Sequence, residues 1–132
     1  MSAVFGDTFY FLALLNERDT AHSRALEFAE SSRGLTTTVW VLTEVGDACS
    51  APGNRAVFLE LLDMLKASPD ARIIEASPEL FDRGVELFRQ RPDKEWSLTD
   101  CISFVAMREA AIDEALTGDH HFEQAGFRAL LK

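Results

Sequence analysis

Short apolar or threonine-rich runs alternate with longer stretches of helical periodicity along this sequence, and this alternation restricts the fold more than any other feature. The runs expected to form strands are 4–6, 35–37, 72–75, 114–117 and, near the end of the chain, 127–131. The stretches expected to form helices are 9–16, 20–32, 39–48, a segment around 58–65, one that begins at Ser77 and one that begins at Ser97. Strands separated by helices pair in parallel and are covered on both faces. We therefore expect an α/β fold, a three-layer α/β/α sandwich with a central parallel sheet of four or five strands, in one domain over residues 1–132.

The stretch that begins at Ser97 is predicted to be an enclosed helix. Ser97 is a good N-cap, and Asp100, three residues later, completes a capping box. The apolar residues on one helical face are Leu98, Ile102, Val105 and Ala106, and those on other faces are Cys101, Phe104 and Met107. Asp100 is thus an ionisable group in a mostly buried helix, where an unpartnered charge is rare. The helix dipole favours an anion there by only about 0.3–1 kcal/mol, so a nearby cation would explain it better.

Composition and chain length favour an ordinary globular domain, with 47% hydrophobic and 27% charged residues. Cys49 and Cys101 lack CxxC or zinc-ligand spacing and are expected to be reduced core thiols. The longest apolar run, 9–15, is too short to span a bilayer. Residues 1–5 lack the basic start of a signal peptide. We expect a cytoplasmic protein with no membrane segment.

The net charge of −9 argues against general, sequence-independent attraction to nucleic acid, although it does not exclude nucleic acid as a substrate. Several acids gathered around a divalent metal would attract phosphate locally. Four basic residues occur in one segment: Arg83, Arg89, Arg91 and Lys94. They are equally consistent with a docking strip for nucleic acid and with solvated charges on a helix face.

Four acids from separate segments are expected to meet at the carboxyl edge of the sheet, where sites form in open parallel sheets. Asp7 directly follows the first strand, and Asp119 follows the fourth strand and a glycine. The helix that begins at Ser97 leads into the fourth strand and runs antiparallel to it, so Asp100 in its first turn lies at the same edge. Glu44 is about six residues past the second strand, roughly 9 Å along a helix, and its side chain tilts back toward the N-terminus.

Such a cluster of carboxylates suits Mg²⁺ or Mn²⁺, hard ions that pair with substrate phosphates. Packed carboxylates repel each other, and without compensation at least one pKa would rise. One or two ions could activate a water and stabilise charge on a phosphodiester. Taken singly, each acid has a simpler interpretation: Asp7 as a helix cap, Glu44 as a solvated helix residue and Asp119 as a turn former.

Other chemistries find less support in the sequence. A serine hydrolase would need a G-x-S-x-G elbow, and an aspartyl-phosphate phosphatase a D-x-D pattern, where this chain has Phe9 at the second aspartate position. No glycine-rich phosphate loop is present. His120 and His121 are candidate ligands or bases, but adjacent histidines in a loop are expected to be surface groups. Trp40 and Trp96 are expected to pack in the core or at its rim.

The sequence resembles the PIN-domain family, and specifically the toxin ribonucleases of the VapC type. The resemblance covers essentially the whole chain. It is carried by Asp7-Thr8 after the first strand, by Glu44, by W-S-L-T-D-C-I-S-F from Trp96 and by L-T-G-D-H-H-F from Leu116. One departure is Phe9, where the family often has a small polar residue after Asp7-Thr8, which would cost a supporting hydrogen bond but no ligand.

The resemblance implies that Asp7, Glu44, Asp100 and Asp119 line a Mg²⁺ or Mn²⁺ site for endonucleolytic cleavage of RNA. Thr8, Ser103 and Thr117 would support these acids by hydrogen bonding. Members of the family commonly form homodimers and are inhibited by a small cognate antitoxin. We therefore predict a metal-dependent ribonuclease, the toxin of a type II toxin–antitoxin system. The alternatives are a catalytically silent PIN-like binding module and a PIN nuclease that acts on DNA or ribosomal RNA outside such a pair.

Overall fold

The computed structural model describes residues 2–132, so Met1, where the predicted domain begins, lies outside the described residues. Five strands form one sheet in the order β3-β2-β1-β4-β5, and all neighbours pair in parallel. The strands are β1 (Val4–Gly6), β2 (Leu35–Thr38), β3 (Ala71–Ile74), β4 (Glu114–Leu116) and β5 (Arg128–Ala129). The helices are α1 (Thr8–Leu15), α2 (His22–Ala29), α3 (Val39–Ala48), α4 (Arg55–Ala67), α5 (Pro78–Gln90), α6 (Leu98–Glu109) and α7 (His120–Gln124).

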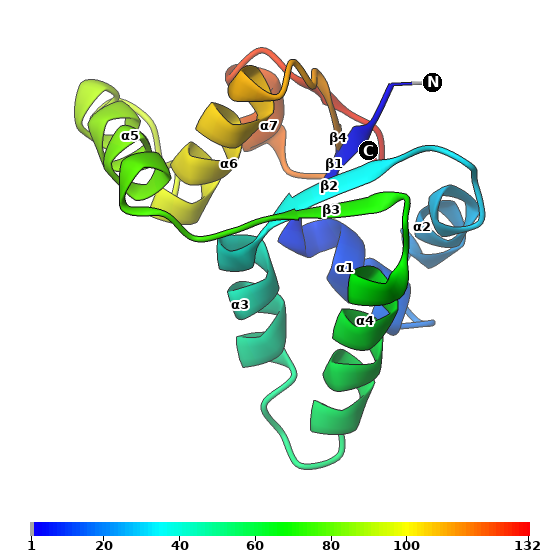
Figure 1. Ribbon diagram of the computed structural model, residues 1–132. Coiled ribbons are helices and arrows are strands. Elements are labelled where there is room, and N and C mark those ends of the chain that lie inside the picture. The colour runs from blue at the N-terminus through cyan, green and yellow to red at the C-terminus, as the bar shows by residue number, and fades with distance from the viewer. Residues whose placement is uncertain (1) are drawn as a thin grey trace.

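Helices cover both faces of this sheet, as Figure 1 shows. On one side lie α1, α3 and α4, and on the other lie α5, α6 and α7. The predicted α/β/α sandwich around a parallel sheet is therefore confirmed, with five strands. Because all strands are parallel, their carboxyl ends share one edge of the sheet, where β1 and β4 end side by side.

Most predicted boundaries agree with the structure to within one residue, but α2 and β5 are shorter than predicted. The second helix begins at His22 rather than at 20, because the Asp19 side chain accepts a hydrogen bond from the Ala21 backbone N–H at 2.8 Å and forms a turn there. It ends at Ala29, after which the Ser31 hydroxyl donates to the Phe28 carbonyl at 2.7 Å. The last strand covers Arg128–Ala129 rather than 127–131.

The sequence prediction missed α7 entirely. Asp119 caps this helix, and its Oδ1 accepts a hydrogen bond from the His121 backbone N–H at 2.9 Å. With only five residues, α7 is too short to show a helical period, so a capped turn and a short helix look alike in the sequence.

The predicted enclosure of α6 is confirmed. Its Ser97 side chain accepts from the Asp100 N–H at 3.0 Å, and the Asp100 carboxylate accepts from the Ser97 N–H at 3.1 Å, which is the predicted capping box. Phe104 is fully buried, and its ring packs edge-on against Trp96 and Phe122 with centroids 5.1 and 4.9 Å away. Trp96 is a core residue as expected, and its indole N–H donates to Gln124 Oε1 at 2.9 Å.

The two cysteines lie in the interior of the protein. Cys49 and Cys101 are free and buried, as predicted. Burial, together with the nearby Asp100 carboxylate, raises the pKa of the Cys101 thiol to about 11, so this thiol is unreactive at neutral pH. Within residues 2–132, none of the helices has the length and apolar character needed to cross a bilayer.

The basic residues of the proposed docking strip are all engaged with acids. Arg83 pairs with Glu109, Arg89 with Glu86, and Arg91 and Lys94 with Asp93. The Arg91 guanidinium also lies over the Trp96 ring, 5.1 Å from its centroid. These contacts with acids favour the interpretation as solvated surface charges over a free basic strip, although Arg91 and Lys94 share the single carboxylate of Asp93.

Close approach of α5 and α6 depends on Gly84. A Cβ at this position would collide with Ile102 Cγ1 and would lie 3.2 Å from Ile102 Cα. We expect Gly84→Ala to lower the free energy of unfolding by about 1–3 kcal/mol, because overpacking outweighs the gain in helix propensity of about 1 kcal/mol. Urea unfolding measures this change.

Gly53→Ala is the matched control, because nothing lies within 4 Å of a Cβ at Gly53. It should change the stability by less than about 1 kcal/mol. Equal stability of the two variants would contradict the proposed helix contact.

Candidate active site

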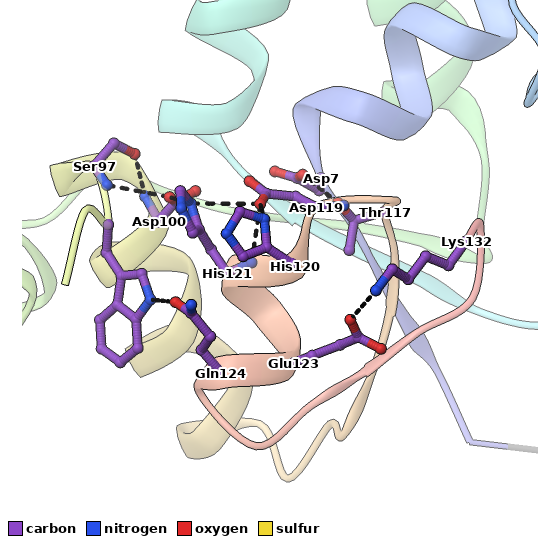
Figure 2. A network of polar contacts seen from close by, with 11 residues as sticks. Asp7, Ser97, Asp100, Thr117, Asp119, His120, His121, Glu123, Gln124 and Lys132 are labelled. Atoms are coloured by element: carbon purple, nitrogen blue, oxygen red, sulfur yellow. Dashed lines mark hydrogen bonds and ion pairs between the residues drawn. The ribbon is translucent and has the colours of Figure 1, made fainter.

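The four acids singled out in the sequence all line one open cleft of about 560 Å³. They come from four elements: Asp7 follows β1, Glu44 lies in α3, Asp100 lies in the first turn of α6 and Asp119 caps α7 after β4. Thr8, Phe9, Glu95, Ser97 and His121 complete the lining. Figure 2 shows Asp7, Asp100 and Asp119 grouped around this point.

Two threonines connect the acids to one another and to the sheet. The Thr117 hydroxyl donates to Asp7 Oδ2 at 2.8 Å and accepts from the Asp119 backbone N–H at 3.0 Å (Figure 2). The Thr8 hydroxyl donates to Glu44 Oε1 at 2.6 Å. The links to Asp7 and Glu44 join segments far apart in the sequence, so these two carboxylates are held by the fold, whereas the link from Asp119 to Thr117 is local.

Ser103 does not make the hydrogen bond expected of it. Its hydroxyl is buried and has no hydrogen-bond partner in residues 2–132. Three residues beyond Asp100, it lies about 4.5 Å further along the helix axis, away from the cleft. The prediction that Ser103 supports the acids is therefore wrong.

The acids of the cleft repel one another and are short of positive charge. The pKa of Asp7 is raised to about 7, mainly by burial and to a smaller extent by the Asp100 and Asp119 carboxylates, against the hydrogen bonds from Thr117 and the Thr8 backbone, which lower it. Burial also raises the pKa of Asp100, and Asp119 adds to this effect. Within residues 2–132, no lysine or arginine forms an ion pair with any of the four acids.

The two adjacent histidines differ in their surroundings. His120 is a surface group as expected, with 64% of its side chain exposed. His121 is not: its side chain is 19% exposed, and Nδ1 lies 3.2 Å from Asp100 Oδ2 and 3.4 Å from Asp119 Oδ1. The expectation that both histidines lie on the surface is wrong for His121, because the unpredicted helix α7 turns this side chain into the cleft.

The donor atoms of the cleft are not all equally close. In the described chain, one group of three or more histidine, cysteine, aspartate or glutamate residues has donor atoms within 4.8 Å of one another, and it consists of Asp119, His120 and His121. Asp7, Glu44 and Asp100 line the same cleft but do not belong to this group. The carboxylates thus face a shared space without touching.

Sequence reasoning missed Glu95 of the lining, and it considered His121 as a candidate ligand or base but expected it to lie on the surface. Both are next to or within the segments that carried the acids, but neither has a spacing that separates it from surface residues. Phe9, the noted departure, packs its ring against Gly118, where an added Cβ would lie 2.6 Å from Phe9 Cζ. Glycine therefore fits at position 118 beneath this ring, whereas a residue with a Cβ would require the ring to shift.

The chain matches the model of one protein family and is similar over most of its length to a known endonuclease. The family model of the PIN domain matches residues 4–128. The 23S rRNA-specific endonuclease VapC20 from two strains of Mycobacterium tuberculosis is 28% identical over 126 residues, which cover 94% of this chain and 95% of that protein.

Two solved structures are similar over nearly the whole chain. The crystal structure of M. tuberculosis VapC20, a sarcin–ricin loop cleaving toxin, has a TM-score of 0.84 at 25% identity and covers 95% of this chain and 96% of that one. VapBC2 from Rickettsia felis, bound to a DNA fragment from its promoter, has a TM-score of 0.69 at 14% identity and covers 98% of this chain and 96% of that one. The second likeness concerns the fold alone.

The raised pKa of Asp7 leads to a prediction about stability and pH. Because the folded chain holds this proton more tightly than the unfolded chain, the metal-free protein should lose stability as the pH rises from about 4 to about 7. Asp7→Asn removes the buried charge, so in EDTA at pH 8 it should be more stable than the wild type by on the order of 2–4 kcal/mol. Urea unfolding at pH 5 and pH 8 measures the difference.

At pH 5 the difference should be smaller than at pH 8 by about 2–3 kcal/mol, because Asp7 is then still mostly protonated in the folded wild type. Asp63→Asn, at an exposed acid of α4, serves as the control and should show no such dependence. A variant Asp7→Asn that is less stable than the wild type at both pH values would contradict the buried, uncompensated charge.

Proposed function

The chain belongs to the PIN domain family, and from this premise we propose that it is a Mg²⁺- or Mn²⁺-dependent endoribonuclease that acts as the toxin of a type II toxin–antitoxin pair. One observation carries the proposal. Four carboxylates from four elements line a single cleft without a lysine or arginine partner in residues 2–132, and the most buried of them has its pKa raised to about 7. An arrangement that disfavours its own charges is suited to a divalent cation.

The donor set of the cleft fits such an ion. Asp7, Glu44, Asp100 and Asp119 offer carboxylate oxygens, the ligands that Mg²⁺ and Mn²⁺ take in proteins. When bound, the ion would activate a water for attack on a phosphodiester and stabilise the negative charge that develops on phosphate. The ion would neutralise the charge of the carboxylates, which no lysine or arginine in residues 2–132 compensates.

The chain's own residues hold these ligands in place. Thr117 donates to Oδ2 of Asp7 and so fixes the orientation of this carboxylate, whose remaining lone pairs can accept a cation. Thr8 does the same for Glu44 by donating to Oε1. The Ser97 backbone N–H donates to Asp100 Oδ2 and fixes that carboxylate at the start of α6. Each acid thus keeps acceptor capacity for a metal while its orientation is set by a hydrogen bond.

We propose a structured ribosomal RNA as the substrate, because VapC20, similar over 94% of this chain, is a 23S rRNA-specific endonuclease. This substrate would place the activity in the cytoplasm. We also propose a homodimer and a cognate antitoxin as partners. Exposed apolar side chains on one face of α4 support a protein interface: Val57 and Met64, seven residues apart, are 40% and 69% exposed.

The catalytic proposal is tested with purified protein and RNA that carries the sarcin–ricin loop. We expect cleavage in Mg²⁺ or Mn²⁺ and none in EDTA, and a loss of about 100-fold or more in Asp7→Asn and Asp100→Asn, because each removes a charged ligand. Asp63→Asn should cleave like the wild type. Denaturing gels that resolve the fragments provide the measurement.

Each alternative has its own outcome in this assay. Cleavage that persists in chelator, or in Asp7→Asn, would exclude the proposed mechanism. Cleavage of DNA but not RNA would indicate a different nuclease, and metal binding without cleavage of either would indicate a silent binding module.

The toxin role is tested in growing bacteria. Induced wild-type protein should arrest growth, whereas Asp100→Asn should not, because the arrest depends on the cleft rather than on expression load. Coexpression of a cognate antitoxin, which is to be sought in the neighbouring reading frame, should restore growth and yield a copurifying complex. Normal growth with soluble, RNA-cleaving wild-type protein would contradict the toxin role and leave the nuclease proposal in place.

A further inference from the structure

His121 lies between two acids of the cleft, and no function has yet been assigned to it. Its Nδ1 is 3.2 Å from Asp100 Oδ2 on α6 and 3.4 Å from Asp119 Oδ1 at the start of α7 (Figure 2). An imidazole nitrogen lies this close to two carboxylate oxygens only when something positive lies between them. In the chain alone that is a hydrogen on Nδ1; in a metal site it is the cation.

The position of His121 is set by the hydrophobic core. The next residue, Phe122, is fully buried, and its ring packs edge-on against Phe104 of α6 at 4.9 Å between centroids. The backbone N–H of His121 donates to Asp119 Oδ1 at 2.9 Å. Further along α7, Gln124 accepts from the Trp96 indole. A side chain held on a packed helix in this way is preorganised toward the cleft rather than free to turn into solvent.

The donor distances match those around an octahedral ion. Neighbouring ligand atoms at bond lengths of about 2.1 Å are roughly 3 Å apart. The distances from His121 Nδ1 to Asp119 Oδ1, 3.4 Å, and to Asp100 Oδ2, 3.2 Å, are each close to this spacing. Of these two acids, however, only Asp119 belongs with His121 to the one cluster in residues 2–132 whose donor atoms all lie within 4.8 Å of one another. His120, the other histidine of that cluster, is 64% exposed, and its Nδ1 is 3.6 Å from Asp119 Oδ1.

We propose that His121 Nδ1 is a nitrogen ligand of the metal in this cleft, beside Asp119, and that the site therefore selects Mn²⁺ over Mg²⁺ more strongly than carboxylates alone would. The inference rests on the proposed function, which supplies the metal. Imidazole nitrogen suits first-row transition ions, whereas Mg²⁺ takes oxygen ligands and dehydrates reluctantly. One nitrogen in a mostly carboxylate site thus discriminates between two ions of the same charge.

Metal affinity is measured by isothermal titration of the full chain with Mn²⁺ and, separately, with Mg²⁺. His121→Ala should weaken Mn²⁺ binding by about 10-fold or more and Mg²⁺ binding by about 3-fold at most, because only the nitrogen contact is lost. His120→Ala is the matched control at the neighbouring, exposed histidine and should change both affinities by less than about 3-fold. Circular dichroism checks that the variants fold.

A hydrogen-bonding role is separated from ligation by His121→Asn, whose amide N–H can still donate to the carboxylates. This variant should be as weak in Mn²⁺ as His121→Ala. Full Mn²⁺ affinity in His121→Asn would overturn the proposal, because it would show that binding does not need the imidazole nitrogen. An equal loss of Mg²⁺ and Mn²⁺ affinity in His121→Ala would overturn it too.

Pulsed electron paramagnetic resonance of the Mn²⁺-loaded wild type gives a test that needs no variant. We expect coupling of the manganese electron spin to a directly bound imidazole nitrogen, retained in His120→Ala and absent in His121→Ala. Bound Mn²⁺ without this coupling would refute the histidine ligand but leave the carboxylate site and the proposed function intact. Failure of the wild type to bind either ion would refute both.

Discussion

The hydrogen bond from Thr117 to the buried Asp7 carboxylate is the contact on which the centre of this structure depends. It joins the ends of β1 and β4, neighbouring strands that are 110 residues apart in the sequence at this point. The same threonine oxygen accepts from the Asp119 N–H and so directs the chain from β4 into α7. One hydroxyl therefore orients two of the four acids and sets the path of the segment that carries His121.

Burial of the Asp7 carboxylate beside other acids lowers the stability of the metal-free protein. Asp7 is 7% exposed, and its neighbours in the cleft carry the same charge, so the chain alone favours protonated Asp7 near neutral pH. Two hydrogen bonds lower its pKa but do not offset burial. A core residue of similar shape without charge would be more stable here. The carboxylate is thus best understood as a ligand whose stabilising partner is a cation, which links metal affinity to pH through Asp7.

The sequence predicts those features of the fold and the site that depend on local patterns, and it does not predict those that depend on tertiary packing. The order of strands and helices and the capping box of Ser97 and Asp100 are local patterns, and both were predicted correctly. The expected meeting of four acids needed only the rule that parallel strands end at one edge, and the structure places all four on one cleft. His121 could not be found this way, because its direction depends on a five-residue helix and on Phe122 packing against Phe104. Ser103 was expected to support the acids only because of the family resemblance, and in the structure its hydroxyl is buried without a hydrogen-bond partner in residues 2–132.

The charge distribution bears on how such a chain would bind RNA at all. With a net charge of −9, and with the arginines and lysine of 83–94 each paired to an acid, attraction for phosphate cannot come from a free basic surface in that segment. The cleft itself repels phosphate as long as its carboxylates are uncompensated. A bound divalent cation reverses the sign of that local field. Metal and RNA should therefore bind cooperatively, and by linkage each should raise the affinity for the other by the same factor.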